Sequence, residues 1–355
     1  MEFYFMDIQD LFDLVIQEKA SDLILSAGAP PILRVNGQLY RTRSDTLTPE
    51  MTEKMIFSFL TKEQKEQFKI EKELDFSLAV GRKHRFRVNV YYQKQCITAA
   101  LRPIPEKIPS LSELGLPETI KDLAFARQGL VLVTGPTGSG KTTTLASLID
   151  IVNNERACHI ITIEDPIEYV HTHKKSIVDQ REVGGDTQNF VRALKYVLRQ
   201  SPDVILVGEM RDLETIQAAL TASETGHLVF ATLHTNDAIQ TIDRIIDVFP
   251  AGQQQQIRFQ LSMVLLAVIS QRLLPRKDGE GRILSYEILR ANNAISNLIR
   301  EGKNYQIYSV LETGFKDGMV TFDRCLKELY LQDLISYEDT LANMKSPSEL
   351  KNASS

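Results

Sequence analysis

A glycine-rich segment at residues 135–142 has the residue types and the spacing that bind phosphate. It fits the pattern G-x-x-x-x-G-K-[ST] at every fixed position. Glycines let the backbone curl with its N–H groups toward anionic oxygens, and the N-terminus of a following helix favours negative charge. Lys141 is placed to neutralise the β- and γ-phosphates of a nucleotide, and the Thr142 hydroxyl is placed to bind Mg²⁺. The predicted ligands are therefore ATP and Mg²⁺, and the predicted nucleotide-binding residues are Gly135, Pro136, Thr137, Gly138, Ser139, Gly140, Lys141, Thr142 and Thr143.

The residues on either side of this segment predict a strand before it and a helix after it. Leu130–Thr134 is an apolar, partly β-branched run, and Lys141–Asn153 carries apolar residues at helical spacing. A chance glycine-rich turn is the alternative, and the pattern arises by chance in roughly one chain of this length in a hundred. The flanking strand and helix favour a phosphate-binding loop.

Three other segments place acidic residues or a histidine where an apolar strand ends. Ile160–Glu168 runs from an apolar strand into carboxylates, Val204–Asp212 passes through Gly208-Glu209, and Gly226–Thr235 reaches His234. Hydrolysis of ATP needs ligands for Mg²⁺, a group that orients water, and positive charge on the transferred phosphoryl. In this fold class such groups lie at the carboxyl ends of neighbouring strands.

Each of these side chains has a candidate catalytic role and a structural alternative. Glu164 is the candidate for polarising the attacking water, and Glu209 for holding Mg²⁺ through water or orienting the nucleophile. The sequence leaves open which of the two carboxylates is the general base. His234 is the candidate for sensing the γ-phosphate by hydrogen bonding. An acidic turn and a structural histidine are the alternatives, and His227, at the start of its strand, is the weaker candidate.

The composition is that of a globular protein and argues against several other classes. The 355 residues are 43% apolar and 25% charged, with a formal net charge of -5, which disfavours a nucleic-acid partner. Cys96, Cys158 and Cys325 form no C-x-x-C pair, so neither a zinc site nor a disulfide framework is expected. Residues 1–10 lack the pattern of a secretory signal, and a cytoplasmic location is expected. Phe259–Ile269 is predicted to be a buried core helix, too short for a transmembrane segment.

Residues 1–102 are predicted to form a small α+β domain. A proline-rich segment at 103–110 is expected to be a stiff linker, because prolines do not fit a helix interior or a central strand. The predicted elements are a helix at Asp7–Lys19, strands at Leu23–Leu25 and Ile32–Val35, a hairpin turn at Asn36-Gly37 leading to Gln38–Tyr40, a helix at Pro49–Phe68, and strands at Asp75–Val80 and Arg85–Tyr92.

From about residue 111 to the end, strands alternate with helices, which predicts an α/β domain with a parallel sheet covered on both faces. The part from about 285 onward is predicted to be mainly helical. The predicted elements include strands at Leu130–Thr134, His159–Ile163, Val204–Val207 and His227–Thr232 and a helix at Gln188–Gln200.

Four separated motifs resemble, in order, those of the secretion ATPases, and within them the twitching-motility ATPases PilT and PilU that retract type IV pili. They are a Walker A at Gly135–Thr142, an Asp box at Ile163–Glu168, a Walker B with a Gly-Glu variant at Val207–Arg211, and a His box at Thr225–Thr235. Ala20–Leu23 and Arg85–Asn89 also match, so the resemblance covers essentially the whole chain.

The resemblance implies a RecA-like P-loop ATPase domain with a PAS-like N-terminal domain, assembled as a homohexamer. It implies ATP at an interface, with Arg87 and Arg102 of the N-terminal domain completing the site. It also implies a motor that couples ATP hydrolysis to pilus retraction at the cytoplasmic face of the inner membrane. The implied partners are an inner-membrane pilus platform protein and a paralogous retraction ATPase.

Alternative functions stay open at this point. Ala294–Glu301 resembles a stretch linked to retraction in PilT-type proteins, with Ser296 in place of an arginine, while 179–184 and 334–339 resemble PilU. An accessory, weakly hydrolysing scaffold is therefore the main alternative. A pilus extension or secretion ATPase, which usually carries a four-cysteine zinc module, and a RecA-like nucleic-acid translocase are disfavoured.

Overall fold

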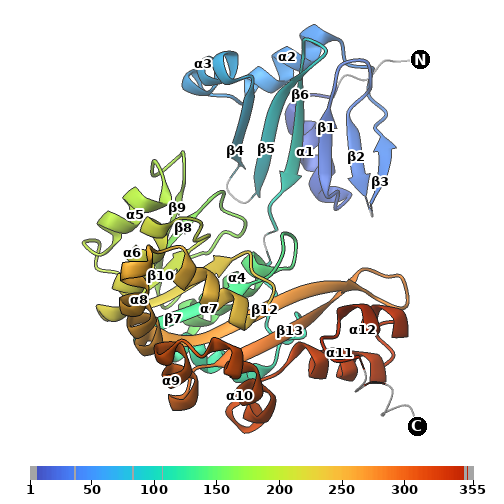
Figure 1. The fold of residues 1–355 in the computed structure, drawn as a ribbon. Helices are drawn as coiled ribbons and strands as arrows, with labels where there is room; N and C mark the ends of the chain where they lie inside the picture. Colours follow the sequence, from blue (N-terminus) through green and yellow to red (C-terminus); the bar gives the residue numbers. More distant parts are fainter. Residues whose placement is uncertain (1–5, 36, 82–83, 106, 348–349, 351–355) are drawn as a thin grey trace. The chain divides into compact units, whose positions relative to one another are not determined.

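The structure is a computed structural model that describes residues 6–35, 37–81, 84–105, 107–347 and 350. The chain divides into two compact units. The N-terminal unit consists of Met1–Lys107 with Pro166–Val170, and the C-terminal unit of Ile108–Asp165 with His171–Ser355. The predicted α/β fold with a smaller α+β unit before it is confirmed (Figure 1).

The N-terminal unit is an antiparallel sheet with helices on one face. Its strands lie in the order β3-β2-β1-β6-β5-β4. The elements are α1 (Ile8–Gln17), β1 (Asp22–Leu25), β2 (Ile32–Val35), β3 (Gln38–Arg41), α2 (Pro49–Ser58), α3 (Lys62–Glu71), β4 (Glu73–Val80), β5 (His84–Gln93) and β6 (Cys96–Pro103).

Helix α1 begins where the sequence predicts and packs its apolar stripe on the sheet. Asp7 caps its N-terminus in a capping box with Asp10. Leu11, Phe12 and Val15 recur at helical spacing and are buried. The Phe12 ring lies 4.8 Å from the Phe86 ring of β5, centroid to centroid, so the core of this unit lies between its helices and one face of the sheet.

The prediction of one helix over Pro49–Phe68 is wrong, because the structure forms two. Helix α2 ends at Ser58, and Thr61 caps α3 in a capping box with Gln64. Met55 and Ile56 of α2 and Phe68 of α3 are buried in the same core, so the apolar pattern alone did not reveal the break. The proline at the first position of α2 is confirmed.

Strand β6 was not predicted, and the linker starts later than expected. Arg102 and Pro103 are the last two residues of β6, where Pro103 is paired with Phe86. A proline fits this central strand because it stands at the strand's end. Of the predicted hairpin turn, Asn36 lies outside the described residues, and Gly37 has a φ of 80°.

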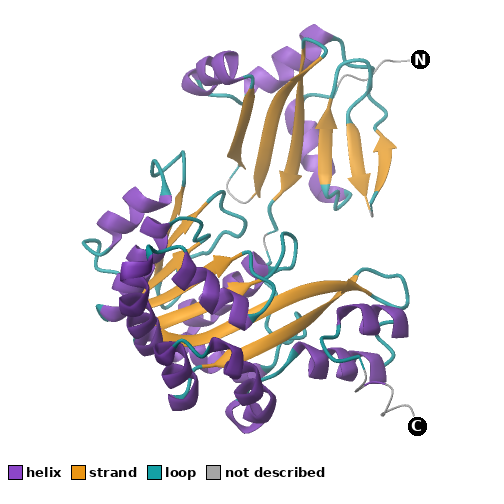
Figure 2. Ribbon diagram, viewed as in Figure 1, coloured by secondary structure: helices purple, strands orange, loops and turns teal. Residues whose placement is uncertain are grey.

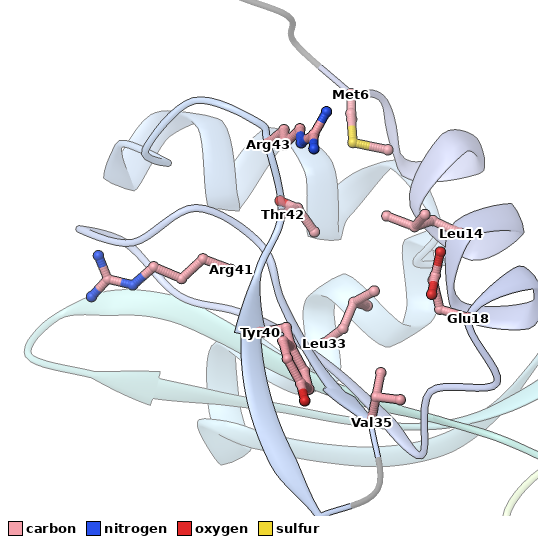
Figure 3. Close-up of a pocket in the computed structure, with 9 residues that line it drawn as sticks. All are labelled: Met6, Leu14, Glu18, Leu33, Val35, Tyr40, Arg41, Thr42 and Arg43. Atoms are coloured by element: carbon pink, nitrogen blue, oxygen red, sulfur yellow. The ribbon is translucent and has the colours of Figure 1, made fainter.

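A cavity of about 490 Å³ lies between α1 and the β2–β3 hairpin (Figure 3). Leu14, Leu33 and Val35 form its apolar wall, while the guanidinium of Arg41 extends away from the other lining side chains. This cavity contains none of the side chains that the sequence singled out for chemistry.

The C-terminal unit is a mixed sheet with helices on both faces (Figure 2). Its strand order is β13-β12-β7-β11-β10-β8-β9, and neighbours are parallel from β12 to β9. The strands are β7 (Gly129–Thr134), β8 (His159–Glu164), β9 (Ile177–Glu182), β10 (Val204–Val207), β11 (Leu228–Leu233), β12 (Leu265–Pro275) and β13 (Arg282–Arg290).

The helices of this unit bury the two faces of the sheet separately. Helix α4 and the 3₁₀ segment η1 pack on one face, and α5 to α10 on the other, while α11 and α12 pack beside β12 and β13. Their bounds are η1 (Glu118–Phe125), α4 (Lys141–Glu155), α5 (Phe190–Val197), α6 (Leu213–Glu224), α7 (Ala238–Asp247), α8 (Ala251–Val264), α9 (Asn293–Glu301), η2 (Asn304–Gln306), α10 (Ile307–Thr313), η3 (Gly314–Asp317), α11 (Phe322–Leu331) and α12 (Tyr337–Asn343).

The prediction of a buried helix at Phe259–Ile269 is wrong. The chain passes from α8 into β12 at Leu265, and Phe259 and Met263 of α8 are 48% and 56% exposed. The strand half of this run pairs with β7 and is buried, so apolar content did not separate helix from strand. Strand β13 was also missed in the part predicted to be helical. Among the described residues, no helix combines the length and apolar character needed to cross a bilayer.

Candidate active site

Four neighbouring parallel strands bring the chemically distinctive segments to one edge of the larger sheet. In the sheet these strands lie in the order β7, β11, β10, β8. The segments after the first three carry Gly135–Thr143, His234 and Glu209, and β8 itself ends at Glu164. Because parallel strands end at the same edge, segments up to about a hundred residues apart in sequence converge on one site.

The predicted phosphate-binding loop lies between β7 and α4 and has the geometry expected of such a loop. Gly135 has a φ of 141°, and a Cβ at this position would clash with the Gln271 carbonyl of β12, so only glycine fits. Gly140 stands at the N-cap of α4 without a side-chain cap, and the first N–H groups of a helix have no acceptor within it. The loop therefore presents backbone donors and a helix N-terminus to an anion.

Lys141 is 8% exposed and bends back over its own loop. Its Nζ donates to the carbonyl oxygens of Gly135 at 2.9 Å and Pro136 at 3.1 Å. The same Nζ lies 3.5 Å from Nδ1 of His234. The lysine ammonium is thus held beside the loop, in a position to contact a polyphosphate bound there.

His234 joins this lysine to Glu209. The Nε2 atom of His234 lies 2.9 Å from Glu209 Oε1, and the Nε atom of Arg211 lies 2.6 Å from the same oxygen. A chain of four side chains therefore connects the P-loop lysine, the histidine, the carboxylate and an exposed arginine. The strand that was predicted to end at Thr232 extends to Leu233, so His234 is the first residue after it.

The charges and hydrogen bonds of these four side chains keep Glu209 ionised. Partial burial works against the charge of Glu209, but the hydrogen bond from Arg211 and the charges of His234, Arg211 and Lys141 outweigh it. The net effect places the pKa of Glu209 below its ordinary value of 4.5. Glu209 is therefore an anion at neutral pH, as an acceptor or an outer ligand of a cation must be.

Glu164 is buried and its carboxylate is oriented by two neighbours. Thr162 Oγ1 donates to Glu164 Oε1 at 2.6 Å, and Gln180 Nε2 donates to the same oxygen at 3.1 Å. The Oε1 atom of Gln180 accepts from the His171 N–H at 2.7 Å, which fixes the orientation of the amide. This scaffold holds one oxygen of Glu164.

Glu164 and Glu209 lie at the ends of adjacent strands that approach closely. Gly208 donates its N–H to the Ile163 carbonyl at 2.8 Å. A Cβ on Gly208 would lie 3.1 Å from that oxygen and 3.3 Å from the Glu164 Cα. The glycine of the Gly-Glu variant therefore allows the two acidic strand ends to sit side by side.

Buried polar contacts hold the loop and its helix in place. Gln271 of β12 donates to Thr144 of α4 at 2.7 Å, and Thr134 Oγ1 lies 2.9 Å from Ser270 Oγ. Ser139 Oγ, in the loop itself, is buried without a hydrogen-bond partner among the described residues. An unpaired buried hydroxyl in a phosphate loop is a donor suited to a bound anion.

The residues present fit a magnesium ion that is held together with a nucleotide. The described residues contain no cluster of three His, Cys, Asp or Glu side chains arranged to hold a metal. Mg²⁺ is commonly bound through one or two protein oxygens plus substrate phosphates, so such a cluster is not required. Thr142, in the first turn of α4, and the ionised Glu209 supply oxygen ligands of the right chemistry.

The other two predicted catalytic residues belong to the N-terminal unit. Arg87 of β5 forms an ion pair with Asp75 at 2.8 Å, and Arg102 of β6 forms one with Asp22 at 2.8 Å. The two arginines are paired directly across β5 and β6. Both side chains are substantially exposed, at 43% and 68%.

Sequence reasoning missed several residues that organise the site. Gln180 and Thr162 orient Glu164, and Gln271 supports α4. No local signal marks Gln180 or Gln271, since each depends on a strand pairing. Thr162 is two residues before Glu164, so it lies on the same face of the strand, and that spacing was a usable signal.

Comparison with known proteins finds relatives along nearly the whole chain. Residues 3–319 match the family described as type II/IV secretion system protein. The chain is 49% identical over 342 residues to the type IV pilus retractation ATPase PilT of Pseudomonas aeruginosa, covering 96% of this chain and 99% of that protein. It is 42% identical over 346 residues to the type IV pilus ATPase PilU of the same organism, covering 98% and 91%. A crystal structure of the pilus retraction motor PilT with bound ADP matches with a TM-score of 0.92 and 50% identity, covering 98% of this chain and 99% of that one.

Proposed function

Since the chain belongs to the type II/IV secretion system protein family, and within it to the PilT and PilU group, we propose that it is an ATPase motor of type IV pilus retraction. The observation that carries this proposal is the connected chain Lys141–His234–Glu209 at the mouth of the phosphate-binding loop. It joins a phosphate-neutralising cation to an ionised carboxylate through a histidine that contacts both. Such an arrangement responds to the charge on a bound nucleotide.

Each residue of the site has a defined task in this proposal. The loop N–H groups and Ser139 bind the phosphates, and Lys141 exchanges its two loop carbonyls for phosphate oxygens. Glu164, held at one oxygen, uses its carboxylate to polarise the attacking water. His234 links the phosphate end of the site to Glu209, so that loss of the γ-phosphate changes the hydrogen bonding of that carboxylate.

Thr142 and Glu209 are the residues that would hold Mg²⁺. The ion supplies charge neutralisation of the phosphates and of the leaving group. The protein's own contribution is to keep Glu209 ionised, through Arg211 and His234. Gly135 also contributes, because only a glycine fits the curled backbone of the loop at that position.

The assembly and partners belong to the same proposal. We take the motor to be a homohexamer in which Arg87 and Arg102 complete the nucleotide site, because arginine fingers supply positive charge on the transferred phosphoryl. It is placed at the cytoplasmic face of the inner membrane, acting on a pilus platform protein and working beside a paralogous retraction ATPase. The relatives named PilT and PilU, two type IV pilus ATPases of one organism, support the proposal of a paralogous partner.

The proposal is tested by steady-state ATP hydrolysis of the full chain with Mg²⁺. We expect robust turnover that Lys141→Ala abolishes by loss of binding and Glu164→Gln abolishes while binding remains. Lys175→Ala, which removes a lysine that pairs with Glu155 away from the site, is the control. Retraction of pili in retraction-deficient cells complemented with these variants should follow the hydrolysis rates.

Two outcomes would decide against a motor. Slow turnover that Glu164→Gln leaves unchanged would point to the accessory scaffold. Hydrolysis stimulated many-fold by single-stranded DNA would point to a nucleic-acid translocase.

A further inference from the structure

A row of charged side chains crosses the N-terminal sheet on the face that carries no helices. Five neighbouring strands, in the order β2, β1, β6, β5 and β4, contribute one residue each, namely Arg34, Asp22, Arg102, Arg87 and Asp75. The charges therefore run plus, minus, plus, plus, minus. Three guanidiniums stand against two carboxylates, so the row keeps a net positive charge.

Strand register produces this row. Asp22 is paired with Arg34, and Arg87 is paired with Arg102. Asp75 is opposite Asn89, one pleat along from Arg87 on the same face. The residues that alternate with the row, among them Leu23, Val88 and Leu101, are fully buried in the core on the other face.

The two central arginines are a like-charged pair that the carboxylates on either side offset. Like charges directly opposite on neighbouring strands are destabilising. Arg102 donates to Asp22 Oδ1 from Nε at 3.0 Å and from Nη2 at 2.8 Å. The other carboxylate oxygen of Asp22, Oδ2, lies 3.3 Å from Arg34 Nε. Arg87 Nη2 lies 2.8 Å from Asp75 Oδ2. Each arginine therefore forms its ion pair with a carboxylate on the side away from the other arginine.

A cavity of about 220 Å³ lies on this row and is lined by both carboxylates, both arginines, Asn89 and Ala100. Ala100 is paired with Asn89 between the strands, and its methyl group leaves room that a larger side chain would fill. A guanidinium carries five N–H donors in a rigid fork, and a carboxylate that holds the fork on one side fixes its plane. The row therefore has the charge, the space and the rigidity of a phosphate clamp.

We propose that Asp75 and Asp22 are positioning residues that hold Arg87 and Arg102 side by side as a clamp for the polyphosphate. This inference rests on the proposed function, because it takes the two arginines as the groups that complete the nucleotide site. In this proposal the carboxylates contact the arginines and not the nucleotide. They affect the transition state by fixing where the two guanidiniums lie. An arginine side chain loses rotamer entropy when it engages a ligand, and a carboxylate that already holds the guanidinium lowers that cost.

The test compares Asp75→Asn with Glu73→Gln in the full chain. Both substitutions remove one negative charge from exposed residues of the same face of β4, two positions apart, and Glu73 forms no ion pair among the described residues. We expect Asp75→Asn to lower kcat about 10- to 100-fold, the effect of misplacing a catalytic group. Affinity for ATP and melting temperature should stay at the parent values, and Glu73→Gln should leave all three unchanged.

Two further variants separate the possible failures. Asp75→Glu keeps the carboxylate and should recover most of the lost kcat, which a general loss of stability would not allow. Arg87→Ala should lower kcat about 10³-fold or more. If Arg87→Ala is inactive while Asp75→Asn keeps the parent kcat, the positioning role is wrong and the proposed function stands. If Arg87→Ala itself hydrolyses ATP normally, the arginine role in the proposed function is wrong, and the positioning role of the carboxylates is wrong as well.

Discussion

The Nε2 atom of His234 lies 2.9 Å from Glu209 Oε1, and the other ring nitrogen of the same histidine lies 3.5 Å from the ammonium of Lys141. One imidazole therefore contacts both the lysine that we propose neutralises phosphate and the carboxylate that follows the neighbouring strand. Which ring nitrogen of the histidine carries the proton is set by the hydrogen bond that the other nitrogen makes. If Lys141 exchanges its loop carbonyls for phosphate oxygens, as we propose, the partner of His234 Nδ1 changes, and this change reaches Glu209 through a single ring.

His234→Ala is expected to lower kcat about 10²-fold while ATP affinity changes little. The reason is that Lys141 keeps its own loop contacts and the backbone donors of the loop are untouched. Equilibrium binding of a nucleotide and steady-state hydrolysis measure the two quantities. His227→Ala, at the opposite end of the same strand and bonded to the Ala222 carbonyl, is the matched control and should retain parent kinetics. An equal loss of binding and turnover in His234→Ala would mean that the histidine only supports the fold.

Gln180→Leu is expected to lower kcat about tenfold or more, because Glu164 loses the donor that the β9 strand supplies. Thr162→Val removes the other donor to the same oxygen and should have a similar effect. Since both act through Glu164, the double variant should lose less than the product of the single losses. Pre-steady-state rates of the three variants measure this coupling, and strictly multiplicative losses would show that the two side chains act independently.

Arg211→Ala is expected to move the acid limb of the pH–rate profile to higher pH. The hydrogen bond from Arg211 is the main effect that lowers the pKa of Glu209, opposing the burial that raises it. Without it the carboxylate protonates at a higher pH and catalysis is lost earlier on acidification. For the same reason the stability that Glu209 contributes is present above pH 4.5 and is lost as the pH falls through its lower folded value. Arg276→Ala, which breaks an exposed pair with Asp278, should leave the profile in place, and an unshifted acid limb in Arg211→Ala would remove Glu209 as the titrating group.

The sequence predicts the fold well where burial is continuous on both faces of a strand. Val204–Val207 is predicted with its observed bounds, and β7 and β8 within one residue, because their side chains are almost all buried. Phe259–Ile269 fails because a helix end and a buried strand are both apolar there. Gln180 reaches Glu164 only through the pairing of β9 with β8, and Arg87 meets Arg102 only through β6, which was not predicted. Motif residues are thus visible in sequence, whereas the residues that orient them depend on strand register.

His171→Gln is expected to reduce the acid sensitivity of the fold. His171 is buried with its Nδ1 unpartnered among the described residues, and burial, aided by Lys174 and opposed by Asp150, lowers its pKa to about 4 from 6.5. The unfolded chain therefore binds a proton at His171 below pH 6.5, whereas the folded chain binds it only near pH 4. As the pH falls from 6.5 to 4, the free energy of unfolding decreases by about 3 kcal/mol. In His171→Gln that part of the pH dependence should disappear, as measured by the free energy of unfolding in denaturant between pH 7 and pH 4. An unchanged pH dependence in His171→Gln would show that this histidine binds its proton in the folded chain, most directly by turning its ring toward Asp150.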